Sequence, residues 1–184
     1  MNYEPKKIDD RRMCTGKCRL SYPHLFEVYA ESGKYQVQLI IPKSDKQTVD
    51  MIMEMERETI KRGIAEKWGG KEPKDLATAL KDGDDIADER PELAGCYYLT
   101  AKTTRKPCVV ARDRSLITDE FEVYAGCYAR ATIAFFAYAA SGNKGVSCLL
   151  NNVQKLEDGE AFGGGVGNLT SDFDDLMPED DCLS

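Results

Sequence analysis

The sequence predicts a mainly β protein with one helical insertion, folded as an OB-fold-like barrel of five to six strands. Three features support this fold class: segments in which polar and apolar side chains alternate, one stretch of helical periodicity between them, and turn residues that separate them. A β-sandwich is the alternative architecture for the same strands. We expect one domain over residues 1–155, with the insertion at about 44–82, and a disordered glycine-rich linker and acidic tail over 156–184.

The first two strands are predicted at residues 13–22 and 34–41, where the side chains alternate with a period of two. Tyr22-Pro23-His24 ends the first strand, and Glu31-Ser32-Gly33 forms the turn before the second. The first strand has a small apolar face and a basic face, which holds Met13, Thr15, Lys17, Arg19 and Ser21.

A helix is predicted from Ser44 to Trp68, because apolar residues recur there at spacings of three and four. Ser44 and Gln47 have the spacing of a capping box, and Gly69-Gly70 ends the helix. A second short helix is expected after Pro73, followed by a loop at residues 82–85.

Further strands are predicted at residues 97–101, 108–111, 127–138 and 146–153. The last two are joined by a tight turn at residues 141–144, which predicts a hairpin. The odd-numbered positions from Cys127 to Ala137 form a core face. The even-numbered positions include Tyr128, Arg130, Phe136 and Tyr138.

This even-numbered face combines aromatic rings with an arginine, and Tyr124 lies just upstream. The combination suits single-stranded nucleic acid, because bases stack on flat rings while basic groups neutralise phosphates. The alternative is that the rings pack under a helix or loop. On this pattern Phe136 is the better core candidate and Tyr128 the better base-stacking candidate.

The overall charge hides a difference between the body and the tail. The chain has 25 Lys and Arg against 32 Asp and Glu, a net charge of -7, but nine of the acids and none of the bases lie from Glu157 onward. Residues 1–156 therefore hold 25 bases against 23 acids, a net charge of +2. A flexible glycine segment that ends in an acidic peptide with apolar residues is typical of a tethered interaction tail.

The sequence does not indicate catalysis, a metal or a cofactor. Cys14 and Cys18 are separated by about 13 Å of extended strand, too far for one tetrahedral ion. The seven cysteines are expected to be free thiols, since their number is odd and residues 1–10 do not resemble an export signal. No apolar segment is long enough to span a membrane. The carboxylates of residues 82–92 leave a magnesium-dependent nuclease as a remote alternative.

Several stretches together resemble a family of bacteriophage and prophage single-stranded DNA-binding proteins with an OB-like fold, long catalogued as a domain of unknown function. The resemblance covers about residues 11–162, and it rests on Leu20-Ser21-Tyr22-Pro23-His24-Leu25-Phe26, Ile41-Pro42-Lys43-Ser44-Asp45, Glu122-Val123-Tyr124-Ala125-Gly126-Cys127-Tyr128-Ala129-Arg130, Phe135-Phe136-Ala137-Tyr138, Gly142-Asn143-Lys144-Gly145 and Leu150-Asn151-Asn152-Val153-Gln154.

The tail separately resembles the acidic C-terminal peptide of bacterial single-stranded DNA-binding proteins through Asp172-Phe173-Asp174-Asp175. It departs from that peptide after Pro178, because the chain continues to Ser184 instead of ending at a phenylalanine.

The resemblance implies a non-catalytic accessory protein that coats single strands without sequence specificity in phage replication or recombination, in the cytoplasm of a bacterial host. A non-catalytic phage structural or protein-interaction protein is the alternative. The expected partners are single-stranded DNA and replication or recombination proteins, with no membrane; a homodimer is compatible with the sequence. From the faces described above, the residues expected at DNA are Lys17, Arg19, Lys43, Lys102, Arg105, Arg112, Tyr124, Tyr128, Arg130, Tyr138 and Lys144, and those expected at a protein partner are Asp172, Phe173, Asp174, Asp175, Leu176 and Met177.

Overall fold

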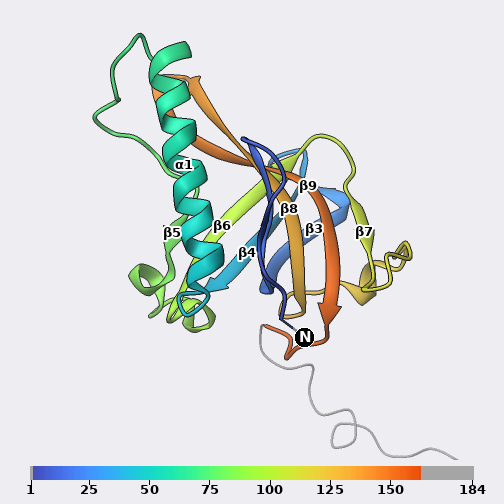
Figure 1. Cartoon of the computed structure of the whole chain (residues 1–184). Helices are drawn as coiled ribbons and strands as arrows, with labels where there is room; N and C mark the ends of the chain where they lie inside the picture. The colour runs from blue at the N-terminus through green and yellow to red at the C-terminus, as the bar shows by residue number, and fades with distance from the viewer. Residues whose placement is uncertain (1, 163–184) are drawn as a thin grey trace, which may run out of the picture.

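The computed structural model describes residues 2–162, in which five long strands close into a barrel (Figure 1). The barrel strands are β3 (Cys18–Tyr29), β4 (Lys34–Pro42), β6 (Cys96–Thr103), β8 (Tyr128–Ala140) and β9 (Asn143–Glu157). β3 pairs with β4, β4 with β6, β6 with β9, β9 with β8, and β8 returns to β3. Within this ring only the β6–β9 pair is parallel, as in the closed Greek-key barrel of the OB type.

Four short strands extend the sheet to nine strands in the described part of the chain. The short strands are β1 (Lys6–Lys7), β2 (Arg12–Cys14), β5 (Lys81–Asp82) and β7 (Cys108–Val110). The prediction of an OB-like barrel is confirmed, and the strand predicted at residues 108–111 corresponds to β7. The sequence analysis predicted neither β1 nor β5, because each has two residues, too few for an alternating pattern to show.

The barrel interior is filled by the side chains that the alternation in residues 127–138 predicts. Every odd-numbered residue from Cys127 to Ala137 is at most 8% exposed, and Phe135 is among the largest fully buried side chains. Phe136, which we expected in the core, is instead 42% exposed. Its position on β8 points outward, and no element covers it fully.

The helix α1 (Lys46–Glu66) packs against β8 and β9 and contributes Val49, Ile52 and Met55 to the core (Figure 1). Its N-cap is Asp45 rather than the expected Ser44, because the Asp45 carboxylate accepts hydrogen bonds from the Thr48 amide and hydroxyl. The helix ends just before Gly69-Gly70, both of which have positive φ, as predicted.

The second helix expected after Pro73 is not formed. Ala77 makes an isolated bridge to Gly145 at the start of β9, and the Ala79 and Leu80 amides donate to the Glu56 carboxylate of α1 at 2.7 and 3.0 Å. These contacts hold the segment extended.

The loop expected at residues 82–85 is largely a short helical turn, η1 (Gly83–Ile86), followed by η2 (Pro91–Leu93). A third turn, η3 (Glu120–Glu122), precedes β8.

The predicted first strand is wrong at both ends. Near Thr15 the chain is divided between the end of β2 and the start of β3. Met13 and Thr15, which were predicted on the basic face, are fully buried, and the Thr15 hydroxyl accepts a hydrogen bond from the Ala131 amide. At the other end β3 does not stop at Tyr22 but continues to Tyr29 through a register shift between Ser21 and His24.

The six described cysteines are free thiols, as expected, and Cys182 lies outside the described residues. Within residues 2–162, no helix has the length and apolar character needed to cross a membrane.

Candidate nucleic-acid interface

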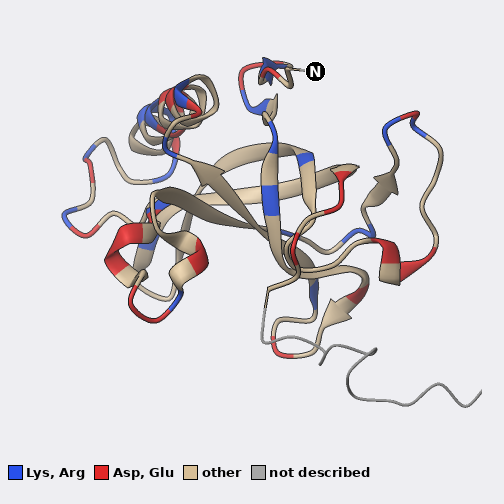
Figure 2. Ribbon diagram, turned by 90° about the horizontal axis from the view of Figure 1, so that it is seen from below, with Lys and Arg blue, Asp and Glu red and all other residues tan. Residues whose placement is uncertain are grey.

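On the barrel strands basic residues outnumber acidic ones, and the acidic residues gather mostly in the segments between strands (Figure 2). The five barrel strands carry six Lys or Arg and only two Glu. The bases are Arg19, Lys34, Lys102, Arg130, Lys144 and Lys155, and the acids are Glu27 and Glu157. Such a surface favours an anionic ligand despite the net charge of the chain.

The outer face of β3, β4 and β6 presents three rows of side chains that alternate with the core residues of these strands. In OB folds the face of the second and third barrel strands, here β4 and β6, binds oligonucleotides. The strand register sets the three rows as Arg19–Ile40–Tyr98, Ser21–Gln38–Thr100 and His24–Gln36–Lys102.

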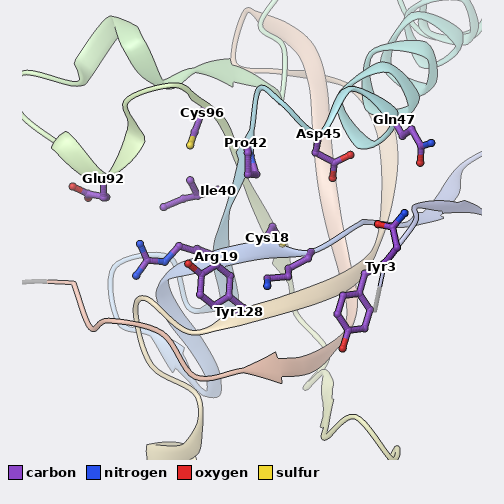
Figure 3. Close-up of a pocket in the computed structure, with 12 residues that line it drawn as sticks. Tyr3, Cys18, Arg19, Ile40, Pro42, Asp45, Gln47, Glu92, Cys96 and Tyr128 are labelled. Carbon is purple, nitrogen blue, oxygen red and sulfur yellow. The ribbon is translucent and has the colours of Figure 1, made fainter.

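A cavity of about 410 Å³ opens at the first row, between the barrel wall and the start of α1 (Figure 3). Tyr128, Arg19 and Ile40 line it from the barrel, and Asp45 and Gln47 line it from the helix end. Tyr3, from the N-terminal segment, closes one side.

Tyr128 lies between two cations in this cavity. The Lys17 ammonium is 4.6 Å and the Arg19 guanidinium 5.2 Å from the centroid of its ring. Charged groups beside a half-buried ring provide both a stacking surface and phosphate neutralisation in one place. The structure therefore brings together three of the predicted residues, from β8, β3 and the turn before β3.

The closing segment, which we define as residues 157–162 at the end of β9 and just beyond it, lies against the same two cations. The Glu157 carboxylate binds Lys17 Nζ at 2.8 Å, and this ion pair lowers the pKa of Glu157. Arg19 donates to the carbonyl oxygens of Gly126 (3.0 Å) and Glu160 (2.6 Å). Gly126 has a φ of 109, and a side chain there would collide with the Glu160 carbonyl, so glycine is needed for this approach.

Tyr124 supports the closing segment rather than the cavity. Its hydroxyl donates to the Asp158 carboxylate at 2.9 Å and accepts from the Gly159 amide at 3.2 Å, and its ring packs on the core. Burial raises the pKa of Tyr124. Lys155, 5.5 Å from the ring centroid, pairs with Asp158.

Tyr138 and Lys144 lie far from the cavity. Tyr138 is ten residues beyond Tyr128 on β8, which corresponds to about 33 Å of extended strand. Lys144 lies in the same hairpin end, where its carbonyl accepts from the Ala77 amide. The Ser141-Gly142 turn that joins the strands has positive φ at both residues, as a tight hairpin requires.

Lys43 is held by two carboxylates, Asp82 at 2.7 Å and Asp84 at 2.6 Å. Hydrogen bonds to Asp82 and Asp84 raise the pKa of Lys43. Asp82 and Asp84, two of the carboxylates on which the nuclease alternative rested, are thus engaged by this lysine, and Asp84 also accepts from the Gly95 amide. Residues 2–162 contain no group of three or more His, Cys, Asp or Glu that could hold a metal ion.

The remaining predicted basic residues have different surroundings. Lys102 is exposed on β6 in the third row, opposite Gln36. Arg105 and Arg112 are exposed in the turns that follow β6 and β7. Arg130 is half-buried on β8 and donates to Gln154 at 2.8 Å. The tail residues Asp172, Phe173, Asp174, Asp175, Leu176 and Met177 lie outside the described residues.

Sequence reasoning missed Tyr22, Arg90 and Tyr3 on this face. Pro23 after Tyr22 predicts only a strand end, although an aromatic residue before proline beside a basic strand face is a usable signal. Arg90 lies among the carboxylates of residues 82–92, and its sequence neighbours give no sign that it folds back to Ser21 and Gln38. Tyr3 lies beside Arg130, 127 positions away in sequence.

Comparison with known proteins gives a consistent result. A family model described as the ssDNA-binding protein of Enterobacter phage Enc34 matches residues 11–183. Protein p50 of Acyrthosiphon pisum secondary endosymbiont phage 1 is 39% identical over 181 residues, covering 90% of this chain and 94% of the relative.

Two solved structures are similar in fold. The single-stranded DNA-binding protein from bacteriophage Enc34, in complex with ssDNA, aligns with a TM-score of 0.75 and 26% identity, over 88% of this chain and 98% of that one. Gp2.5, a single-stranded DNA-binding protein encoded by bacteriophage T7, aligns with a TM-score of 0.62 over 91% of this chain and 97% of that one. At 16% identity, the second likeness shows a common fold alone.

Proposed function

The chain belongs to the family of phage single-stranded DNA-binding proteins represented by that of Enterobacter phage Enc34, and we propose that it coats single-stranded DNA without strong sequence preference during phage replication or recombination. Its action is binding and not catalysis. The DNA runs across the outer face of β3, β4 and β6, with bases on aromatic rings and phosphates near lysine and arginine side chains.

The observation that carries this proposal is the position of Tyr128 between Lys17 and Arg19 in an open cavity of the barrel face. A base stacked on one aromatic ring contributes about 1–3 kcal/mol, and stacking does not require a particular base. The two cations supply the phosphate contacts that position a strand without reading its sequence.

We further propose that the acidic tail competes with DNA for this face and recruits replication or recombination proteins when DNA displaces it. The closing segment supports the first part, because Glu157 already binds Lys17 and the Glu160 carbonyl already accepts from Arg19. The tail begins directly after this segment, so its acidic residues are tethered near the cations that the DNA needs.

The test is fluorescence anisotropy of a labelled oligo-dT of about 30 nucleotides, long enough for more than one OB-fold site. It is titrated with the full chain and with a chain lacking residues 168–184, at low and at moderate salt. We expect binding that weakens steeply with salt and is tighter without the tail, because phosphate neutralisation releases counterions.

The two parts of the proposal fail separately. Absence of binding by either chain at about 100 mM salt would overturn single-strand binding and favour a structural or interaction protein. Weaker binding by the truncated chain would overturn the competition and make the tail part of the DNA-binding surface.

A further inference from the structure

We propose that the third row of the barrel face contains a second nucleobase subsite, between Tyr22 and the ring pair His24–Tyr29. The inference rests on the proposed function and adds to it where a second base of the same DNA strand binds. Tyr22, His24 and Tyr29 come from one strand, β3, and none of them belongs to the set of residues predicted from sequence.

The backbone conformation that exposes the Tyr22 side chain to solvent is energetically unfavourable. Its φ is 45, in the left-handed region that non-glycine residues avoid, and it sits at the register shift between Ser21 and His24. Such a conformation costs about 1–3 kcal/mol and is found where a side chain must be re-aimed. The result is an aromatic ring that is 56% exposed on the barrel face.

The Arg90 side chain packs against the Tyr22 ring. Its guanidinium carbon lies 4.9 Å from the Tyr22 ring centroid. The guanidinium also donates to Gln38 at 2.7 Å, to Ser21 at 3.1 Å and to Glu92 at 2.9 Å, so it is itself held in place. A ring that is already oriented loses less conformational entropy when a base stacks on it.

The pocket next to Tyr22 has the chemistry of a base site. It encloses about 210 Å³ and is lined by Tyr22, His24, Tyr29, Gln36, Gln38 and Thr100. His24 and Tyr29 form a ring pair with centroids 4.6 Å apart. The lining has aromatic, amide and hydroxyl groups but no Lys, Arg, Asp or Glu, which suits a neutral base edge better than a phosphate.

The cation needed for the phosphate lies at the edge of this pocket. Lys102 pairs across the strands with Gln36, is exposed, and makes no ion pair among the described residues. The phosphate next to a base in the pocket can therefore meet Lys102. No equivalent free cation is needed inside the pocket itself.

The two subsites lie on one continuous surface. The Tyr128 cavity and the Tyr22 pocket are two rows apart, about 13 Å along β4 from Ile40 to Gln36. Arg90 and Glu92 connect them, because Glu92 lines the Tyr128 cavity and binds the arginine that holds Tyr22. One extended strand can then place different bases on Tyr128 and on Tyr22.

The experiment compares oligo-dT binding by the full chain with binding by Tyr22→Asn. Asparagine removes the ring but accepts a left-handed backbone, so the bulge is preserved. We expect affinity to fall about 5- to 150-fold, the equivalent of one lost base stack. Phe136→Ala is the matched control, since it removes a 42% exposed ring on β8 outside both subsites, and it should leave affinity unchanged.

A second oligonucleotide separates a base contact from a structural effect. On an oligo with abasic sugars in place of its bases, Tyr22→Asn and the unaltered chain should bind equally, because only phosphate contacts remain. Equal binding of both proteins to oligo-dT would overturn the subsite while the proposed function stands. An undiminished effect on the abasic oligo would also overturn it, since the loss would then not depend on a base.

Discussion

The guanidinium carbon of Arg19 lies 4.2 Å from the centroid of the Phe162 ring, and the Phe162 amide donates to the Ala125 carbonyl at 3.0 Å. The final residue that the structure describes thus covers a cation that flanks Tyr128. A phenyl ring on a guanidinium is the arrangement that a nucleobase would adopt there. We therefore expect Phe162 and a DNA base to compete for Arg19.

Removing this competition should strengthen DNA binding. We expect Phe162→Ala to tighten oligo-dT binding by about 2- to 5-fold, the equivalent of one exposed cation–π contact. Glu157→Gln should act in the same direction, because it frees Lys17. Both are measured by anisotropy at low salt. Weaker binding by Phe162→Ala would show instead that this ring contacts the DNA.

Tyr128 and Tyr138 provide a direct comparison of two rings on one strand. Tyr128→Ala should weaken oligo-dT binding by about 1–3 kcal/mol, because it removes the stacking surface between Lys17 and Arg19. Tyr138→Ala, at the far end of β8, should have a smaller effect. A loss of equal size for Tyr138 would mean that the DNA path follows the whole length of β8.

The salt dependence should distinguish a free lysine from a paired one. Lys102→Ala should reduce the slope of log affinity against log salt concentration by about one, as expected for one lost phosphate contact. Lys43→Ala should leave that slope unchanged, because Lys43 is bound by Asp82 and Asp84. A reduced slope for Lys43→Ala would indicate that DNA displaces those carboxylates.

We expect Glu56 to contribute to the free energy of unfolding and not to the affinity for DNA. Glu56→Ala leaves the Ala79 and Leu80 amides without their acceptor and should lower the free energy of unfolding by about 2 kcal/mol or more, measured by urea denaturation. Glu56→Gln keeps an acceptor and should lose less. Equal losses for the two variants would show that the hydrogen bonds contribute little.

The raised pKa of Glu56 predicts that the stability of the fold depends on pH. Burial raises the pKa of Glu56, so the folded chain holds this proton more tightly than the unfolded chain does. Its contribution to stability is then greatest at acidic pH and falls as the pH rises through the raised pKa. The stability difference between Glu56→Gln and the unaltered chain should therefore shift in favour of Glu56→Gln as the pH rises from the ordinary carboxyl range through the raised pKa. A constant difference would contradict the direction of this shift.

Local patterns in the sequence were enough for the main elements. The alternation from Cys127 to Ala137 identifies a core face because the side chains of a strand point to opposite sides in turn, and all six odd-numbered positions are buried. The spacing of apolar residues after Asp45 likewise identifies α1. Tyr128, Lys17 and Arg19 could be predicted as candidates from the sequence because each lies in or beside such a pattern, and the structure places them together.

The tertiary structure decided which of these side chains meet. The sequence alone determined that the chain forms a basic β barrel with one helix and an acidic end, since periodicity and charge are local properties. It could not separate Tyr128 from Tyr138, which share one face of β8 but lie at opposite ends of it. It could not pair Lys43 with Asp82, or Arg90 with Ser21, because those contacts follow from barrel closure between distant segments. Strand register, the bulge at Tyr22 and the return of residues 157–162 onto Arg19 depend on packing of the whole barrel, which no local pattern encodes.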